Sequence, residues 1–290
     1  MTYSIVARDP ETGELGVGIQ THQPAAGASC PWVQAGVGAV VTQATGNVAF
    51  GPQALALLAN GLPADRTLAA ILAADNLPEK RQVAIVDAEG RVAVHTGEAC
   101  IPFAGHRTGD GYSVQANLVA RDTVPDAMAE AFELTKGPLP VRILAALDAA
   151  EAEGGDLRGR QSAALLVMRE PLDYRWDLRV DNDPEPLVKL RELVSIRLAS
   201  QVLKSIDLDR AGDDPGRRLA AAVSAFARAQ ELAPSDEDAF FFAVRTLTAV
   251  PAIDEACRIL DALFERAPQW RDLLLRLPEE ELKPLQERYR

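Results

Sequence analysis

Residues 1–22 read MTYSIVARDPETGELGVGIQTH, and this stretch decides the fold. Two runs rich in β-branched and apolar residues, YSIVARD and LGVGIQTH, flank the turn sequence PETGE, a pattern that is typical of a β-hairpin. The first strand begins at residue 3, directly behind Met1 and Thr2. Chain ends are usually loose, so a strand that starts this early indicates that Thr2 is held at the edge of a sheet.

The chain up to about residue 185 repeats this alternation of strands and short helices. The pattern predicts strands in VGAVVTQA, YSVQANLVA, QSAALLVM and YRWDLRVD, a second hairpin in RQVAIVDAEGRVAVHTG, and helices in GPQALALLANG, DRTLAAILAAD, VPDAMAEAFELT and LPVRILAALDAAEAEGGD. Hairpins indicate antiparallel sheets, and runs such as VGAVV and AALLV are apolar on both faces. We therefore expect an α+β fold with two packed sheets and helix layers outside them.

From about residue 186 the sequence is helical. PLVKLRELVSIRLASQVLKSIDL is a long amphipathic candidate, and AGDDPG follows it as a linker. Ala233-Pro234 and Ala267-Pro268 are 34 residues apart, which is the tetratricopeptide period. We predict two domains, residues 1–210 and 211–290, of which the second is either tetratricopeptide-like or an ordinary helical tail.

Composition excludes some classes of function. The chain has 290 residues, 48% of them apolar, and a net charge of −12 with no cluster of Lys and Arg, which argues against binding of nucleic acid or of an anionic membrane surface. It shows no signal-peptide pattern and no apolar run of membrane-spanning length. The three cysteines are scattered. These features predict a reduced, cytoplasmic protein without disulfides.

Thr2 is the first candidate for chemistry. A hydroxyl needs a base to become a good nucleophile, and an N-terminal threonine carries an α-amine with a reference pKa of about 7.7–8.0. Methionine aminopeptidases remove Met1 when the next residue is small. This is the logic of N-terminal-nucleophile hydrolases, although a threonine behind the initiator is also common without any chemical role.

Five ordered blocks strengthen this interpretation. MTYSIVARDPETGELGVGIQTH, WVQAGVGAVVTQA, TGEACIPFAGHRTGDGYSVQANLV, GGDLRGRQSAALLV and RVDNDPEPLVKLREL together resemble the Ntn-hydrolase-like family called domain of unknown function 1028, over roughly residues 1–200. The resemblance implies a four-layer αββα sandwich but no settled reaction. Relatives can carry a C-terminal extension proposed to bind peptidoglycan, whereas the tail here looks more like tetratricopeptide helices.

One feature departs from proteasome-type threonine proteases, which use a lysine on an early strand. The first lysine here is Lys80. Arg8 could supply positive charge near a substrate, but arginine does not deprotonate at useful pH. The base would therefore be the amine of Thr2 itself.

Several polar residues are candidates for binding or for stabilising an oxyanion. Gln115 and Asn117 are two apart in a strand, so both point to one face, where they hydrogen-bond either an oxyanion or solvent. Gln43, two residues before Thr45, has the same pattern, and His22 ends the second strand. Each is a candidate substrate contact, with an ordinary structural hydrogen bond as the alternative.

The Gly-rich segment CIPFAGHRTGDG supplies further candidates. His106 and Asp110 lie in it, and its GDG sequence could approach a ligand closely. Zinc could in principle use His95, Cys100 and His106, but their spacing fits no common template, so we predict no metal and no cofactor. Five further polar residues flank strands: Arg158, Arg160, Gln161, Asp181 and Asp183. Their side chains either pair with opposite charges, bind a ligand or solvate a turn.

Two functions follow from these patterns. The first is hydrolysis of an amide bond in a small molecule or peptide, with Thr2 as nucleophile. The second is an inactive sandwich that binds a small metabolite and, through its tail helices, a protein or cell-wall partner. A homodimer is expected in either case.

Overall fold

The computed structural model describes residues 2–171, 175–204, 214–248, 250 and 252–290. The chain divides into two compact units, Met1–Arg191 and Glu192–Arg290. This division falls within helix α5 (Pro186–Lys204). The boundary predicted between residues 210 and 211 lies outside the described residues.

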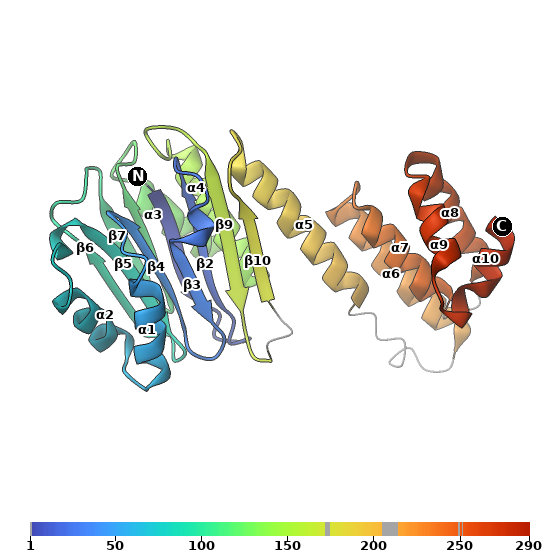
Figure 1. Ribbon diagram of the computed structural model, residues 1–290, viewed down its shortest axis with the longest axis horizontal. Helices are drawn as coiled ribbons and strands as arrows, with labels where there is room; N and C mark the ends of the chain where they lie inside the picture. Colours follow the sequence, from blue (N-terminus) through green and yellow to red (C-terminus); the bar gives the residue numbers. More distant parts are fainter. Residues whose placement is uncertain (1, 172–174, 205–213, 249, 251) are drawn as a thin grey trace. The chain divides into compact units, whose positions relative to one another are not determined.

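The first unit contains a six-stranded antiparallel sheet (Figure 1). Its order is β10 (Arg175–Val180), β9 (Ser162–Met168), β2 (Leu15–Thr21), β1 (Thr2–Arg8), β8 (Tyr112–Asn117) and β7 (Gly105–Gly109). The predicted opening hairpin is β1 and β2, paired from Tyr3 with Gln20 to Arg8 with Leu15. Because β1 pairs with β8 on its other side, Thr2 lies at the end of an interior strand and not along an edge strand.

A second antiparallel sheet has four strands, β3 (Pro31–Gln34), β4 (Gly38–Ala44), β5 (Arg81–Asp87) and β6 (Val92–Thr96), in that order. Strands β3 and β7 were not expected from the sequence. Residues 105–111 of the Gly-rich segment, which was expected to be a loop, form β7 and its tight turn into β8. Its glycines weaken the local strand signal, and pairing with β8 supplies the strand that local preference does not.

The two sheets pack face to face, and helices cover their outer faces. Helices α1 (Phe50–Ala59) and α2 (Ala64–Ala73) contact the four-stranded sheet, while α3 (Val124–Leu134) and α4 (Leu139–Ala152) contact the six-stranded sheet (Figure 1). Alternate residues of β2 point inward, so Leu15, Val17 and Ile19 are buried in the core between the sheets. Burial of this apolar surface is the main driving force for the arrangement.

Two glycines of β2 let α4 approach the six-stranded sheet. A Cβ atom at Gly18 would lie 2.3 Å from Cγ2 of Ile143, and one at Gly16 would lie 2.6 Å from Cδ1 of the same side chain. Larger residues on this face would therefore force helix and sheet apart. Only glycine fits at these two positions on the outward face of β2, because the Ile143 side chain occupies the space that a Cβ atom would need.

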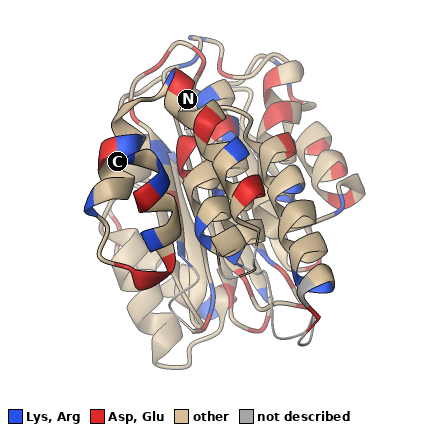
Figure 2. Cartoon of the chain, turned by 90° about the vertical axis from the view of Figure 1, so that its right-hand side faces the viewer, with Lys and Arg blue, Asp and Glu red and all other residues tan. Residues whose placement is uncertain are grey.

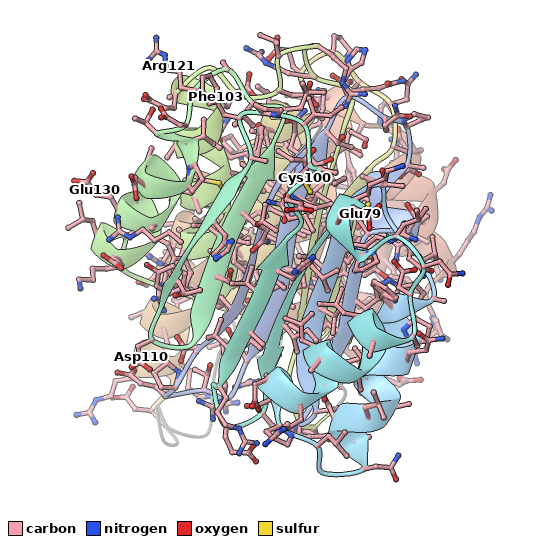
Figure 3. All side chains as sticks on the ribbon, turned by 90° about the vertical axis from the view of Figure 1, so that its left-hand side faces the viewer. Glu79, Cys100, Phe103, Asp110, Arg121 and Glu130 are labelled. Atoms are coloured by element: carbon pink, nitrogen blue, oxygen red, sulfur yellow. The ribbon has the colours of Figure 1, made fainter. Side chains whose placement is uncertain are left out.

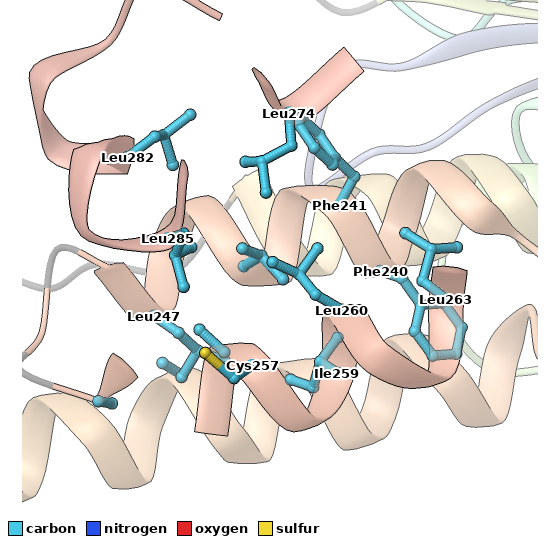
Figure 4. Close-up of a cluster of buried hydrophobic side chains, with 14 of the residues drawn as sticks. Phe240, Phe241, Leu247, Cys257, Ile259, Leu260, Leu263, Leu274, Leu282 and Leu285 are labelled. Atoms are coloured by element: carbon cyan, nitrogen blue, oxygen red, sulfur yellow. The ribbon is translucent and has the colours of Figure 1, made fainter. Parts of the chain in front are cut away.

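The second unit is helical. Besides the C-terminal part of α5 it contains α6 (Pro215–Leu232), α7 (Glu237–Thr248), α8 (Ile253–Arg266), α9 (Gln269–Arg276) and α10 (Lys283–Tyr289). Its core is built from buried side chains that include Phe240, Leu247, Leu260 and Leu274 (Figure 4). Figure 2 shows both acidic and basic positions along the helices.

The 34-residue spacing has a local structural counterpart. Ala233 directly follows α6 with φ −141° and ψ 78°, and Ala267 directly follows α8 with φ −142° and ψ 73°. Both alanines are buried, and each donates its backbone N–H to the carbonyl four residues earlier. The two Ala-Pro pairs therefore end two helices in the same backbone conformation.

None of the helices in the described part of the chain is both long enough and apolar enough to span a membrane.

Candidate active site

A polar layer lies between the two sheets at the end where β1 begins. Strands β1, β4, β5 and β8 contribute its side chains, none of which is more than 6% exposed: Thr2, Ser4, Gln43, Gln82, Gln115 and Asn117. Their positions follow the period of two that places alternate residues on one face of a strand. Polar groups replace the apolar core at this end, so each needs a hydrogen-bond partner.

Gln82 is the hub of this layer. Its Nε2 donates to the carbonyl oxygens of Ala116 at 2.9 Å and Gly105 at 3.1 Å, and to Oγ1 of Thr96 at 3.0 Å. Its Oε1 accepts from Nε2 of Gln43 at 2.7 Å and from Nδ2 of Asn117 at 2.9 Å. One amide thus ties β5 and β4 of one sheet to β7 and β8 of the other.

The amide of Gln115 is held by neighbouring hydroxyls. Nε2 of Gln115 donates to Oγ of Ser4 at 2.6 Å, and its Oε1 accepts from Oγ of Ser113 at 2.9 Å. Oγ of Ser4 in turn donates to Oε1 of Gln43 at 2.6 Å. Gln115 is therefore part of the packed layer, opposite Ser4 in the β1–β8 register, and it is not among the residues that line the cavity beside Thr2.

Thr2 lies at the end of this layer and borders a cavity of about 420 Å³. Its Oγ1 donates to Oγ1 of Thr21 at 3.0 Å, and its backbone carbonyl accepts from Nε2 of Gln43 at 3.4 Å. Asn117 faces Thr2 across the β1–β8 register. Of the candidate residues, the structure therefore brings Gln43 and Asn117 close to Thr2.

The cavity has a polar lining. The residues that matter for chemistry are Thr2, Thr21, Cys30, Gln43, Gly46 and Arg158. Ala44, at the end of β4, has a left-handed backbone with φ 65°, which turns the chain into the segment that carries Gly46. This volume lies within the range of about 300–1,000 Å³ that is usual for small-molecule sites.

Arg158 enters the cavity wall from the loop before β9. Its Nε and Nη2 lie 3.3 and 3.2 Å from the two carboxylate oxygens of Asp156, whose side chain is fully buried. Asp156 also accepts the backbone N–H of His22 at 2.9 Å. His22 is half-buried beside this loop, its Nδ1 has no hydrogen-bond partner among the described atoms, and it does not line the cavity.

Arg8 and Asp110 lie at the other end of the first unit. Thr2 and Arg8 are the two ends of β1, so six residues of extended chain, about 20 Å, separate them. The backbone N–H of Arg8 donates to the carbonyl of Gly111 in the β7–β8 turn, next to Asp110. Figure 3 shows Asp110 at the opposite end of the sheet from Phe103 and Arg121. Neither residue reaches Thr2.

His106 lies on the edge strand β7, away from the cavity lining. Its Nδ1 is 2.9 Å from Oγ1 of Thr96, while Nε2 of His95 is 2.8 Å from the carbonyl of Pro78. Partial desolvation, helped by the nearby His95, lowers the pKa of His106. Sγ of Cys100 donates to the carbonyl of Arg81 at 3.4 Å, and the described residues contain no group of three or more His, Cys, Asp or Glu suited to a metal ion.

Two further cavity residues did not stand out in the sequence. Thr21 contacts the hydroxyl of Thr2, and the hairpin could have revealed it, because pairing Arg8 with Leu15 places Thr2 opposite Thr21. Cys30 lines the same cavity, and burial raises the pKa of its thiol, with a smaller opposing effect of a hydrogen bond to Ser29. No sequence pattern marks Cys30, because a loop between β2 and β3 delivers it.

Solved structures offer two comparisons. A crystal structure of a DUF1028 protein from Silicibacter pomeroyi is 31% identical, with a TM-score of 0.63, and the match covers 67% of this chain and 84% of that one. The ancestral beta-subunit Anbu from Yersinia bercovieri is 11% identical, with a TM-score of 0.33, over 69% of this chain and 96% of that one. No curated protein matches the chain.

The model of the family of unknown function DUF1028 matches residues 2–190, which is nearly the whole of the first unit. That segment contains both sheets, the polar layer and the cavity beside Thr2. The chain therefore belongs to the DUF1028 family.

Proposed function

We propose that this protein is an N-terminal-nucleophile hydrolase that cleaves an amide bond in a small molecule or peptide, with Thr2 as the nucleophile after removal of Met1. The observation that carries the proposal is the place of Thr2: the second residue of the chain begins an interior strand and borders a cavity of about 420 Å³. The stack of helices, two sheets and helices supports the finer assignment to an αββα sandwich of this hydrolase type.

The chemistry follows from groups at one residue. The α-amine of Thr2 accepts the Oγ1 proton while Oγ1 attacks the amide carbon, and then returns that proton to the leaving amine. An ester forms between Thr2 and the acyl group, and water activated by the same amine hydrolyses it. Oγ1 of Thr21 lies 3.0 Å from Oγ1 of Thr2 in the resting site, and this contact orients the nucleophile before its proton passes to the amine.

The oxyanion needs a hydrogen-bond donor close to Thr2. Nδ2 of Asn117 donates to Gln82 and Nε2 of Gln115 donates to Ser4, so these amides already have partners. Gly46 lines the cavity, and the backbone N–H groups on either side of it, at Thr45 and Asn47, donate to other protein groups. We assign the backbone N–H of Gly46 as the principal oxyanion donor, with Asn117 holding the strand end that carries Thr2.

The first experiment is the intact mass of protein made in cells that remove initiator methionine, followed by N-terminal sequencing. Met1-processed protein is then treated with a β-lactone, which acylates N-terminal threonine, and the adduct is located by peptide mass spectrometry. We expect one adduct on Thr2, loss of the adduct in Thr2→Ala, its retention in Thr2→Ser, and no change in Thr12→Ala, a turn variant. Quantitative retention of Met1, or labelling that persists in Thr2→Ala, would refute the proposal.

The second unit carries a separate proposal. We infer that residues 192–290 form a tetratricopeptide-like unit that binds a protein partner. The matching backbone conformations at Ala233 and Ala267, 34 residues apart, support a repeat of helix pairs. Phe242 is 40% exposed and lines a cavity of about 260 Å³ in this unit, together with Arg245. Phe242→Ala and Arg245→Ala should reduce capture of a partner by the full chain, with Leu273→Ala, another exposed apolar position, as the control.

A further inference from the structure

Arg158 determines which chemical class of ligand the cavity beside Thr2 is suited to bind. Among the described residues that line this cavity, Arg158 is the only one with a charged side chain. The whole chain is strongly acidic, with 42 Asp and Glu against 30 Lys and Arg. Among the described lining residues no carboxylate accompanies this guanidinium, so the cavity wall presents a positively charged group in a chain whose net charge is −12.

The ion pair behind the cavity orients this charge. Nε and Nη2 of Arg158 face the two oxygens of Asp156 at 3.3 and 3.2 Å, a two-point contact that holds the guanidinium plane. The Asp156 side chain is 0% exposed and accepts backbone N–H groups of His22 and Arg158, both at 2.9 Å. The negative end of the pair is thus buried in protein, and the positive end is in the cavity wall.

We propose that the substrates of this cavity are small amides that also carry a carboxylate, and that Arg158 binds the carboxylate while Thr2 attacks the amide carbon. The inference rests on the proposed function of Thr2. A guanidinium fixed in one plane is suited to a carboxylate. Hydroxyl and amide groups of residues such as Thr21, Thr42 and Gln43 add neutral polar groups to the lining. A cavity of about 420 Å³ limits the ligand to a small molecule or the end of a peptide.

The test uses full-length, Met1-processed protein and two matched series of probes. Succinamate, glutaramate and adipamate carry one amide and one carboxylate at increasing separation, and the corresponding diamides lack the carboxylate. Ammonia release measures hydrolysis, and calorimetric titration of Thr2→Ala measures binding independently of catalysis. We expect at least one monoamide to bind and react, and its diamide to be about 10- to 100-fold poorer in kcat/KM, the range for loss of a charge-assisted hydrogen bond.

Variants identify the residue responsible. Arg158→Met should weaken binding of the reactive monoamide to Thr2→Ala by a similar factor and leave the diamide unchanged. Arg160→Met is the matched control, because Arg160 is two residues away, pairs with Glu151 and Glu185, and does not line the cavity. If Arg158→Met fails to fold because it leaves Asp156 buried without a partner, the double variant Asp156→Asn/Arg158→Met removes both charges and gives the same test.

The outcomes separate the two proposals. Binding of monoamides that depends on Arg158, without ammonia release, would overturn the hydrolase and support the carboxylate site. Hydrolysis of diamides as fast as of monoamides, unaffected by Arg158→Met, would overturn the carboxylate preference and support the hydrolase. Absence of both binding and hydrolysis across the two series overturns the carboxylate preference.

Discussion

Gln82→Met would remove the hub of the polar layer between the sheets. Gln82 is fully buried and joins Gln43 of β4, Asn117 of β8 and the carbonyl of Ala116. Methionine has a similar length and no hydrogen-bonding amide, so two buried N–H groups and one buried carbonyl would lose their partner. Each unmade buried hydrogen bond costs about 1–2 kcal/mol, and we expect a loss of about 3–5 kcal/mol in the free energy of unfolding.

The assay must report on the first unit only. The chain has three tryptophans, of which Trp32 and Trp176 lie in the first unit and Trp270 in the second. Tryptophan fluorescence during urea unfolding in a Trp270→Phe background therefore follows the unit that contains Gln82. Gln53→Met, at an exposed position of α1, is the matched control and should change the free energy of unfolding by less than about 0.5 kcal/mol.

A small effect would refute this reasoning. If Gln82→Met lowers the free energy of unfolding by less than about 1 kcal/mol, the polar layer does not hold the two sheets together as argued. The same variant should slow β-lactone labelling of Thr2, because the carbonyl of Thr2 contacts Gln43, which Gln82 positions. Unchanged labelling would show that the strand pairing of β1 positions Thr2 without help from the contact between its carbonyl and Gln43.

Three further predictions concern packing and charge. Gly18→Ala should cost about 1–3 kcal/mol in the same urea assay, because its Cβ would meet Ile143 at 2.3 Å; wild-type stability would contradict the close packing of α4. A hydrogen bond from Arg81 holds the pKa of Asp75 below its ordinary value, so this pair stabilises the fold above about pH 4, and the contribution is lost as pH falls through the lowered pKa. Asp75→Asn should therefore flatten the decline in the free energy of unfolding between about pH 5 and 3. An unchanged decline would refute this assignment. Partial desolvation and a neighbouring histidine lower the pKa of His106, so its NMR titration midpoint should lie below the ordinary value of 6.5, and a midpoint above it would contradict the structure.

Local sequence determined most of the elements of the first unit. The hairpin pairs two segments rich in apolar residues, 3–8 and 15–20, across a Pro- and Gly-containing turn, and this local pattern of apolar runs and turn residues was enough to predict it. Helices α1 to α4 were predictable for the same reason, since their apolar spacing requires one buried stripe each. Strands β3 and β7 were not, because short or Gly-rich edge strands form through their partners and carry little local signal.

Some residues of the candidate site were likewise predictable from local sequence, whereas others are placed only by tertiary contacts. The sequence by itself indicated Thr2, from its position in the chain, and it placed Gln115 and Asn117 on one face of β8, because alternation along a strand is a local property. Only the tertiary structure separated Arg8 and Asp110 from Thr2, since the direction of each strand decides which end of the sheet a residue occupies. Only the tertiary structure brought Arg158 into the cavity of Thr2, because β9 pairs with β2 and its preceding loop then lies beside the end of the hairpin, a contact between residues far apart in the chain.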